Sequence, residues 1–289
     1  KFVDRTFNCN HKHAIEIRKY IKEHDKGITN FHFEVAADLL NEEELELIES
    51  MRPGLIQLEI GVQSTNEQTI REIRRTMRFE EVARIVQRIN QGENVHQHLD
   101  LIAGLPYEDM ESFQKSFDDV YRLHPEQLQL GFLKVLKGSY MESQKERYGL
   151  VYKSRPPYEV LYTKWLSYEE MMQLKSVEEM VEVYYNSRQF SYCLRKLEEE
   201  YASPFVLYQG LGRYYENHEL HLMSHSRITR YEILLGFIRE KHKERESLCR
   251  ELLTFDLYLR ENVKNRPEFA GEHEVSKDWL NAFYETESK

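Results

Sequence analysis

Long hydrophobic stretches are absent from this 289-residue sequence. No apolar run approaches the ~18 residues of a membrane-spanning helix, and no basic segment followed by an apolar one marks a signal peptide. Cysteine is scarce, and three cysteines cannot build a disulfide framework, so we expect a soluble protein of the cytoplasm. A basic excess is also missing, because 40 Lys+Arg against 50 Asp+Glu give a net charge of −10. This balance argues against nucleic-acid binding through phosphates.

Glycine becomes rare after the segment Lys153-Ser-Arg-Pro-Pro157. Eight of the 12 glycines precede this segment, and 13 of the 19 tyrosines follow it. Glycine-rich turns fit short strand-to-helix connections, whereas a Tyr-rich, Gly-poor stretch fits packed helices. We therefore predict two domains, residues 1–153 and 154–289, the second of them all-α. Ser167 with Glu170, Ser176 with Glu179, and Ser203 before Pro204 are spaced as helix starts. Further helices are predicted over 204–216, 228–241, 244–263 and 276–285.

In the first half, strand-like and helix-like patterns alternate. The predicted strands are 1–7, 29–36, 55–63, 95–103 and 127–136, and the predicted helices are 13–25, 42–51, 66–91 and 109–124. Asn41 with Glu44 has capping-box spacing, and Asp109 is placed to cap the last of these helices. Strand–helix–strand units of this length indicate parallel βαβ architecture, either an open sheet or a barrel.

Polar and apolar residues alternate along these strands, which favours the barrel. Strands buried on both faces of an open sheet read as nearly continuous apolar runs, and these do not. One face is apolar, and the other carries carboxylates, amides and imidazoles that are costly to bury without partners. We predict a curved sheet whose concave face is a polar cavity, the alternative being a mixed sheet with one solvated face. The residues expected on the concave face include Glu34, Gln57, Glu59, Gln63, His98 and Asp100.

Five polar or glycine-containing stretches follow the predicted strands at their carboxyl ends, where sites of α/β proteins form. They are Asp4-Arg-Thr-Phe-Asn8, Glu34-Val-Ala-Ala-Asp38, Glu59-Ile-Gly-Val-Gln-Ser64, Asp100-Leu-Ile-Ala-Gly-Leu-Pro106 and Leu133-Lys-Val-Leu-Lys-Gly-Ser139. Each stretch alone is a weak signal. Five of them in order, all at strand ends, predict a ligand site at this edge.

With these stretches in this order, residues 1 to about 153 resemble the radical S-adenosylmethionine (radical SAM) enzymes. The likeness is greatest to the branch with an amino-terminal cobalamin-binding domain and a helical carboxyl-terminal region. Phe2-Val-Asp-Arg-Thr-Phe7 is similar to the second strand of the family's TIM-like barrel, and Gly61-Val-Gln-Ser64 to its fourth-strand motif beside the ribose and methionyl groups of SAM. Asp100 to Glu108 resembles the adenine-contacting fifth strand. The resemblance implies SAM contacts at Asp4, Glu34, Glu59, Gly61, Gln63, Ser64, Asp100, Gly104, Leu105, Pro106, Val135 and Leu136.

The sequence departs from the family at its cysteines. The family's CxxxCxxC loop holds a four-iron, four-sulfur (4Fe–4S) cluster through three thiolates, whereas this chain has only Cys9, Cys193 and Cys249, which lack that spacing. The resemblance therefore implies a fragment that begins at the second strand, lacks the cluster loop, and is itself inactive although its parent is an enzyme. We expect it to bind less than one cluster and to bind SAM no more tightly than about millimolar, or about −4 kcal/mol. Dimerisation through the exposed edge at residues 1–7 is also expected.

Four other patterns each allow a structural interpretation and a functional one. Cys9, His11 and His13 alternate as metal ligands would, but a loop-to-helix junction without metal is preferred. His218, His221 and His225 share a helical spacing, with metal binding again the less favoured interpretation. Arg71, Arg74, Arg75 and Arg78 form a basic helical face that suits a phosphate, although a solvated face is preferred. The tyrosines from Tyr158 to Tyr215 fit a helical core better than a substrate lid.

Two functions remain open from the sequence. The first is a piece of a radical enzyme that reductively cleaves SAM for methyl transfer, cyclisation or oxidoreduction on a small-molecule or unknown substrate. In this hypothesis an upstream domain binds cobalamin. The second is a non-catalytic barrel scaffold whose helical half docks a protein partner. A CxxxCxxC motif immediately upstream of Lys1 in the parent gene would support the first, and its absence the second.

Overall fold

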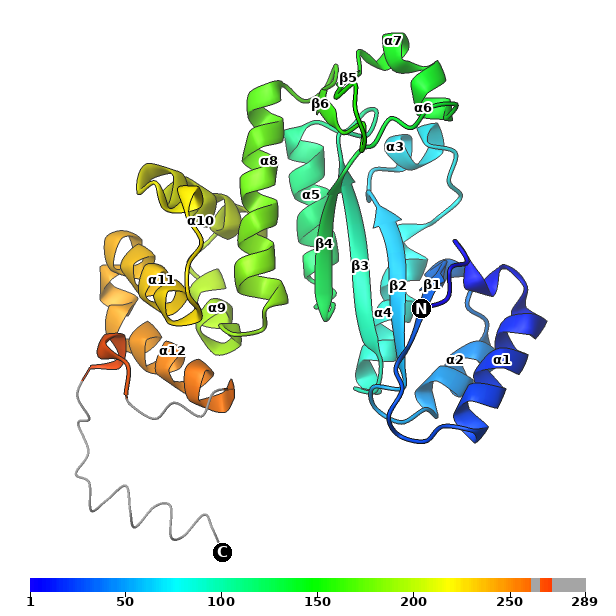
Figure 1. Ribbon diagram of the computed structural model, residues 1–289, viewed down its shortest axis with the longest axis horizontal. Coiled ribbons are helices and arrows are strands. Elements are labelled where there is room, and N and C mark those ends of the chain that lie inside the picture. Colours follow the sequence, from blue (N-terminus) through cyan, green and yellow to red (C-terminus); the bar gives the residue numbers. More distant parts are fainter. Residues whose placement is uncertain (261–265, 272–289) are drawn as a thin grey trace, which may run out of the picture. The chain divides into compact units, whose positions relative to one another are not determined.

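The computed structural model describes residues 1–260 and 266–271. Contacts divide the chain into two compact units (Figure 1). The first contains Lys1–Ser187 and Tyr201–Arg213, and the second contains Arg188–Glu200 and Tyr214–Lys289. Each unit is described separately below.

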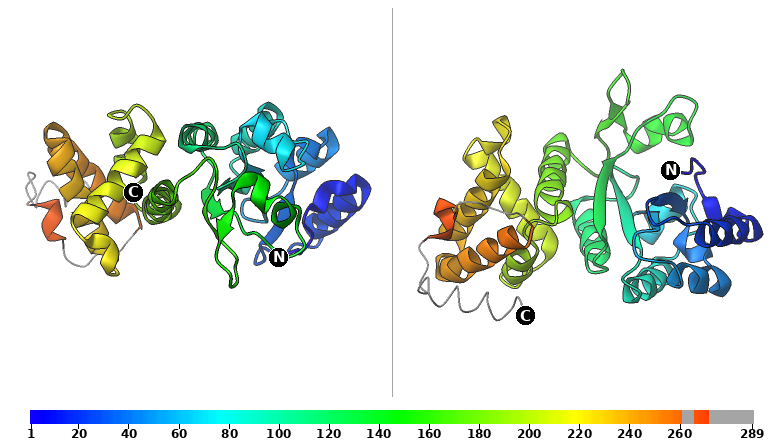
Figure 2. Two further views of the ribbon diagram at one scale, coloured as in Figure 1. Left: turned by 90° about the horizontal axis from the view of Figure 1, so that it is seen from above. Right: turned by 60° about the horizontal axis from the view of Figure 1, so that its bottom comes forward.

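A four-stranded parallel sheet forms the centre of the first unit, as predicted. Its order is β1-β2-β3-β4, so each strand pairs with its neighbour in sequence. The crossover between consecutive strands is helical each time, and Figures 1 and 2 show the crossover helices outside the sheet. The strands are β1 (Phe31–Val35), β2 (Ile56–Gln63), β3 (His96–Ala103) and β4 (Gln127–Phe132), and the helices are α1 (His11–Glu23), α2 (Glu42–Glu49), α3 (Glu67–Glu72), α4 (Phe79–Gln91) and α5 (Met110–Tyr121).

The predicted alternation places apolar side chains on one face of the sheet. Along β2 every second residue is buried, and Leu58, Ile60 and Val62 are at most 1% exposed. Apolar faces of α4 and α5 supply the facing core through residues such as Val86 and Phe113. The opposite face carries the polar residues, and the parallel sheet with its crossover helices matches the predicted partial barrel-type α/β fold.

A buried ion pair joins the first two helices. Arg18 of α1 donates to Glu44 of α2 at 2.9 Å, and both side chains are fully buried. The guanidinium also lies 5.3 Å and 5.4 Å from the ring centres of Phe7 and Phe33. Glu44 forms the predicted capping box with Asn41, and Asp109 caps α5 as predicted.

The strand predicted over residues 1–7 is wrong. Its only backbone hydrogen bond to the sheet joins the Phe2 N–H to the His32 carbonyl at 3.0 Å, and Phe7–Cys9 forms a short 3₁₀ turn, η1. The Asn8 side chain explains the turn, because it bonds both the N–H and the carbonyl of Ala36. Phe7 is thereby drawn into the core against Phe33, with ring centres 4.5 Å apart.

Three further boundaries differ from the predictions. The helix predicted over 66–91 is two helices, α3 and α4, because Arg74 turns the chain with a φ of +60°. Ser176 lies inside α8 (Tyr168–Met180) and starts no helix, whereas Ser167 and Glu170 form the predicted capping box. The last predicted strand ends at Phe132. The Leu133 N–H still donates to the Ala103 carbonyl of β3, but residues 133–135 then pair with the segment 158–160.

Later residues of the first unit pack along the edge of β4 that does not pair with β3. The Asn186 side chain bonds both the N–H and the carbonyl of Leu128, which satisfies part of the open strand edge. Residues 154–187, assigned from sequence to the second domain, thus belong to the first compact unit. Its remaining elements are η2 (Ala37–Leu39), α6 (Tyr140–Ser143), α7 (Lys145–Tyr148), β5 (Val151–Tyr152), β6 (Val160–Tyr162), η3 (Val181–Asn186) and most of α10 (Pro204–Asn217).

The second unit is helical in its described part, as predicted. Cys193 of α9 and Cys249 of α12 are buried where those helices pack, and each thiol shifts the pKa of the other, raising that of Cys193 and lowering that of Cys249. The helix predicted over 276–285 lies outside the described residues. Nowhere in residues 1–260 and 266–271 is a helix long and apolar enough to cross a membrane. The elements are α9 (Ser191–Glu198), η4 (Leu220–Leu222), α11 (Arg227–Lys241), η5 (Lys243–Arg245), α12 (Glu246–Arg260) and η6 (Glu268–Ala270).

Candidate functional site

The polar face of the sheet carries its charged side chains in rows across the strands. Glu34 of β1 is in register with Glu59 of β2, which is in register with His98 of β3. One step toward the carboxyl end, Gly61 is in register with Asp100, and Asp100 with Gln129 of β4. Residues in register on parallel strands share a face, so the predicted concave set lies together.

Acidic groups dominate these rows. Lys1 pairs with Glu59 at 2.5 Å, and His32 Nδ1 lies 3.9 Å from the same carboxylate. Burial, together with the carboxylates of Glu59 and Glu34, raises the pKa of Asp100 to about 7. His98 Nε2 lies 3.2 Å from Asp100 Oδ1. Asp100 therefore exchanges a proton near neutral pH.

A pocket of about 430 Å³ opens at the carboxyl ends of β1 and β2. Glu34 and Asp38 supply its negative charge, whereas Arg5, Arg74 and Arg75 supply positive charge. Gly61 and Gln63 also line it, so three of the predicted site residues meet here. A pocket with both signs of charge suits a polar, zwitterionic ligand.

Close packing around Gly61 shapes one wall of this pocket. Gln63 lies at a β-bulge with a φ of +71°, and its amide folds back over Gly61. A Cβ at position 61 would lie 2.3 Å from Gln63 Nε2 and 3.6 Å from an Arg75 nitrogen. Arg75 also donates to the Gly61 carbonyl at 3.0 Å. A side chain at position 61 would therefore displace the Gln63 amide from this position.

Ser64 lies away from the pocket. It is fully buried, and its hydroxyl donates to Glu108 Oε1 at 2.5 Å. Ser116 of α5 donates to the same oxygen at 2.9 Å and accepts the Thr65 N–H at 3.0 Å. Burial raises the pKa of Glu108 to about 7, although the two hydroxyls favour its charged form. Ser64 and Glu108 thus tie the loop after β2 to α5.

The remaining predicted residues are distributed around the same edge of the sheet. Gly104 has a φ of +88°, and a Cβ there would lie 2.7 Å from Val160. Leu105 and Val135 are buried, Leu136 is half exposed, and Asp4 is exposed outside the residues that line the pocket. The Pro106 carbonyl accepts a hydrogen bond from Thr69.

Sequence reasoning missed Arg75 and Asp38 as pocket residues. The arginines at 71, 74, 75 and 78 do not form one helical face, because α3 ends at Glu72 and the chain turns at Arg74. Arg75 is turned toward the sheet, where Asp38, Glu34 and Asp100 stabilise its charge against desolvation. Arg71 stays exposed. Asp38 closes one of the five strand-end stretches, which was its only signal.

Histidines of the two predicted metal patterns hydrogen-bond to protein groups in the structure. His11 bonds Glu44 at 2.7 Å from the first turn of α1. The rings of His218, His221 and His225 hydrogen-bond to the backbone carbonyls of Tyr214, Tyr215 and Leu220. Among the described residues, the three-ligand grouping lies elsewhere, at Glu200, His242 and Glu244.

Comparison with known families decides the identity of the sheet-bearing part. Residues 2–120 match the model of the radical SAM superfamily. This part of the chain is of the radical SAM type. Its sheet of four parallel strands and its helical region correspond to a partial radical SAM barrel followed by helices. Residues 146–289 match a second family, described as a protein of unknown function (DUF4080).

Solved radical SAM structures show remote likeness. The methyltransferase TsrM from Kitasatospora setae, with cobalamin and a [4Fe-4S] cluster bound, is 15% identical with a TM-score of 0.43, over 57% of this chain and 34% of that one. Coproporphyrinogen III oxidase (HemN) from Escherichia coli is 21% identical with a TM-score of 0.38, over 44% of this chain and 29% of that one. The chain thus spans about a third of these proteins. No curated relative matches it.

Proposed function

We propose that this radical SAM chain supplies the SAM-binding wall of a radical SAM enzyme. The observation that carries the proposal is a set of buried polar atoms on the polar face of the sheet, of which those of Gln63 line the pocket. In the described part of the chain, Gln63 Oε1 is buried without a hydrogen-bond partner. Asp100 Oδ1 and His98 Nε2 are also buried and lie 3.2 Å from each other, but without the geometry of a hydrogen bond. Buried polar atoms of this kind are costly unless a ligand or water satisfies them. The hydroxyls of a ribose would do so.

The charges around the pocket support the same ligand. SAM ends in an ammonium and a carboxylate, and the pocket offers Glu34 and Asp38 for the first and Arg75 and Arg5 for the second. By family resemblance, Gly104 to Pro106 and Val135 with Leu136 would contact adenine. Asp4, Glu59 and Ser64 complete the proposed set, Ser64 by holding the loop from behind.

The cysteines do not fit the 4Fe–4S cluster. Cys9 is exposed on η1, whereas Cys193 and Cys249 are buried against each other between α9 and α12. We therefore derive no step through a cluster bound by these residues. In the proposed enzyme the cluster ligands come from residues outside this sequence.

Reductive cleavage of bound SAM supplies the radical chemistry of such enzymes. The contribution of this chain is to hold and orient the ligand. Arg75, fixed by the Gly61 carbonyl, anchors negative charge at one end of the pocket. Asp100, with a pKa of about 7, is able to donate to or accept from a hydroxyl at neutral pH.

Several finer parts of the proposal concern the parent protein. Methyl transfer, cyclisation and oxidoreduction on an unknown substrate remain the proposed outcomes, with cobalamin in an upstream domain and a cytoplasmic location. A homodimer through the outer edge of β1 also belongs here. The Phe2 N–H already bonds the His32 carbonyl on that edge, so the dimer would form through the other backbone groups of β1. Light scattering at high protein concentration tests for the dimer.

The test uses the parent protein with a CxxxCxxC loop, reconstituted with iron and sulfide under anaerobic conditions. With dithionite, we expect SAM to be consumed and methionine to form. Arg75→Ala should slow this at least about tenfold, as loss of a charge-assisted contact of about 1.5–3 kcal/mol implies. Arg71→Ala is the matched control, since its side chain is 74% exposed.

The scaffold hypothesis makes the opposite prediction: no stoichiometric cluster and no SAM consumption. Equal rates in Arg75→Ala and Arg71→Ala would also contradict the proposed pocket. This chain alone should hold less than one cluster after the same treatment, and brown colour that survives desalting would refute that part.

A further inference from the structure

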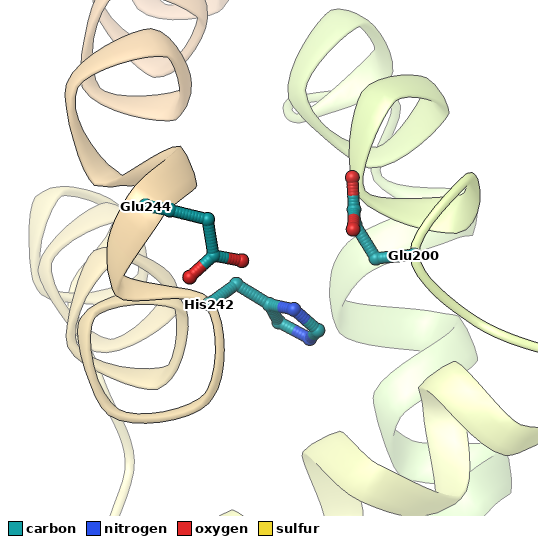
Figure 3. A group of neighbouring side chains, drawn as sticks. All are labelled: Glu200, His242 and Glu244. Atoms are coloured by element: carbon teal, nitrogen blue, oxygen red, sulfur yellow. The ribbon is translucent and has the colours of Figure 1, made fainter.

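Three side chains of the second unit converge away from the sheet. Ligand atoms of Glu200, His242 and Glu244 all lie within 4.8 Å of one another. Figure 3 shows that Glu200 approaches from one side, while His242 and Glu244 approach from the other. Glu200 follows α9, and the other two lie at the turn between α11 and α12. One imidazole and two carboxylates are thus brought together from distant parts of the sequence.

Backbone hydrogen bonds hold both sides of this grouping. The His242 N–H donates to the Ile238 carbonyl at 2.7 Å, which ends α11. The Arg245 N–H then donates to the His242 carbonyl at 2.8 Å and closes the η5 turn that carries Glu244. The Glu200 N–H donates to the Leu197 carbonyl at 3.0 Å. The two ligands on the turn therefore have a fixed backbone spacing.

Arg245 orients the Glu200 carboxylate. Its guanidinium lies 2.6 Å from Glu200 Oε1, and the Glu200 side chain is only 21% exposed. A carboxylate has two oxygens, so this ion pair leaves Oε2 for another partner. Outer partners of this type fix the orientation of metal ligands and are a regular part of metal sites.

The donor set and spacing suit a divalent metal ion. Zinc binds nitrogen and carboxylate oxygen at about 2.0–2.2 Å, which places neighbouring ligand atoms about 3–3.5 Å apart. The observed limit of 4.8 Å needs only small side-chain rotations to reach this, and the exposed Glu244 is free to make them. Two carboxylates balance the charge of the ion, and imidazole suits zinc among first-row metals.

We propose that Glu200, His242 and Glu244 bind a divalent transition-metal ion, with zinc as the best-suited species and water as a fourth ligand. The site would pin the end of α9 to the turn between α11 and α12. The Arg245 and Lys243 cations on the same turn lower the attraction for a cation, so micromolar affinity is expected. This site is independent of the SAM pocket and of the missing cluster ligands.

Zinc binding to the metal-stripped chain, measured by competition with a chromophoric chelator, tests the proposal. We expect one micromolar site, and at least about tenfold weaker binding in His242→Ala and Glu244→Gln. His221→Ala is the matched control, because that imidazole lies in the same unit but bonds the Tyr215 carbonyl. Cobalt(II) should give the absorption of a four-coordinate nitrogen–oxygen site in wild type and control only.

Glu244→Gln changes an exposed side chain and should fold normally, which circular dichroism would verify. Wild-type zinc affinity in both Glu244→Gln and His242→Ala would overturn the proposal. Absence of a micromolar site in the wild-type chain would overturn it as well. A zinc-dependent rise of the melting temperature that is lost in the two variants, but kept in His221→Ala, would support it.

Discussion

Glu108 is a carboxylic acid without solvent contact, two residues beyond the strand-end stretch Asp100–Pro106. Its Oε1 accepts two serine hydroxyls, whereas Oε2 is buried without a partner among the described residues. Burial raises its pKa from 4.5 to about 7. The folded protein therefore binds this proton more tightly than the unfolded chain does, and the stability gained from the protonated form is lost as pH rises from about 4.5 to 7.

Glu108→Gln should remove this pH dependence. The difference in unfolding free energy between variant and wild type should shift in favour of the variant by up to about 3 kcal/mol between pH 4.5 and 8. Asp100 titrates in the same direction, so the two proteins must be compared at each pH by urea denaturation. Glu111→Gln, on the exposed side of α5, should show no such shift. A constant difference across this range would contradict the buried proton.

Residue types at strand ends predict part of the site and miss the rest. Glu34, Gly61 and Gln63 line the pocket, and their motif positions were readable from the sequence. Arg75 was not, because its place depends on the turn at Arg74, whose φ of +60° no propensity for arginine indicates. Ser64 carried the motif but turns to Glu108, since a hydroxyl at a bulge is able to bond on either side of the sheet.

Between elements, the Arg18–Glu44 pair is the most consequential contact of α1 with α2. Removing one partner leaves a buried charge uncompensated, so Glu44→Ala should lower the unfolding free energy by about 3–5 kcal/mol. Glu43→Ala is a matched control. Its carboxylate pairs with Lys19 at 2.8 Å, but both side chains are more than half exposed, so the loss should stay below about 1 kcal/mol. Similar losses in the two variants by urea denaturation would contradict this.

Periodicity predicted the faces of the elements better than their ends. The alternation in β2 and β3 fixes which side chains point to the helices, since the opposite register would bury carboxylates. The failure at residues 1–7 has a long-range cause, because the Asn8 side chain bonds Ala36 and draws Phe7 into a turn. The capping boxes at Asn41 and Ser167 begin helices as predicted. Ser176 shows that the same spacing occurs inside a helix.

For the whole molecule, groupings made by distant helices lie beyond sequence reasoning. Cys193 and Cys249 meet only because α9 packs on α12, and Glu200 reaches His242 for the same kind of reason. The sequence spacing of the residues predicts neither of these two pairings. The parallel sheet differs, because its order follows the chain and brings all strand ends to one edge. The strand-end stretches therefore predicted the edge of the sheet at which the pocket lies.

Mapping SAM onto this chain by amide NMR titration tests the central claim most directly. The account predicts saturation only in the millimolar range, about −4 kcal/mol, because Cys9, Cys193 and Cys249 do not fit the cluster that the family resemblance assigns to the methionyl end. Shifts should be largest around Gly61, Gln63, Arg75 and Asp100, at the carboxyl ends of β1, β2 and β3. Shifts centred elsewhere, no shifts at all, or a micromolar constant would contradict the account.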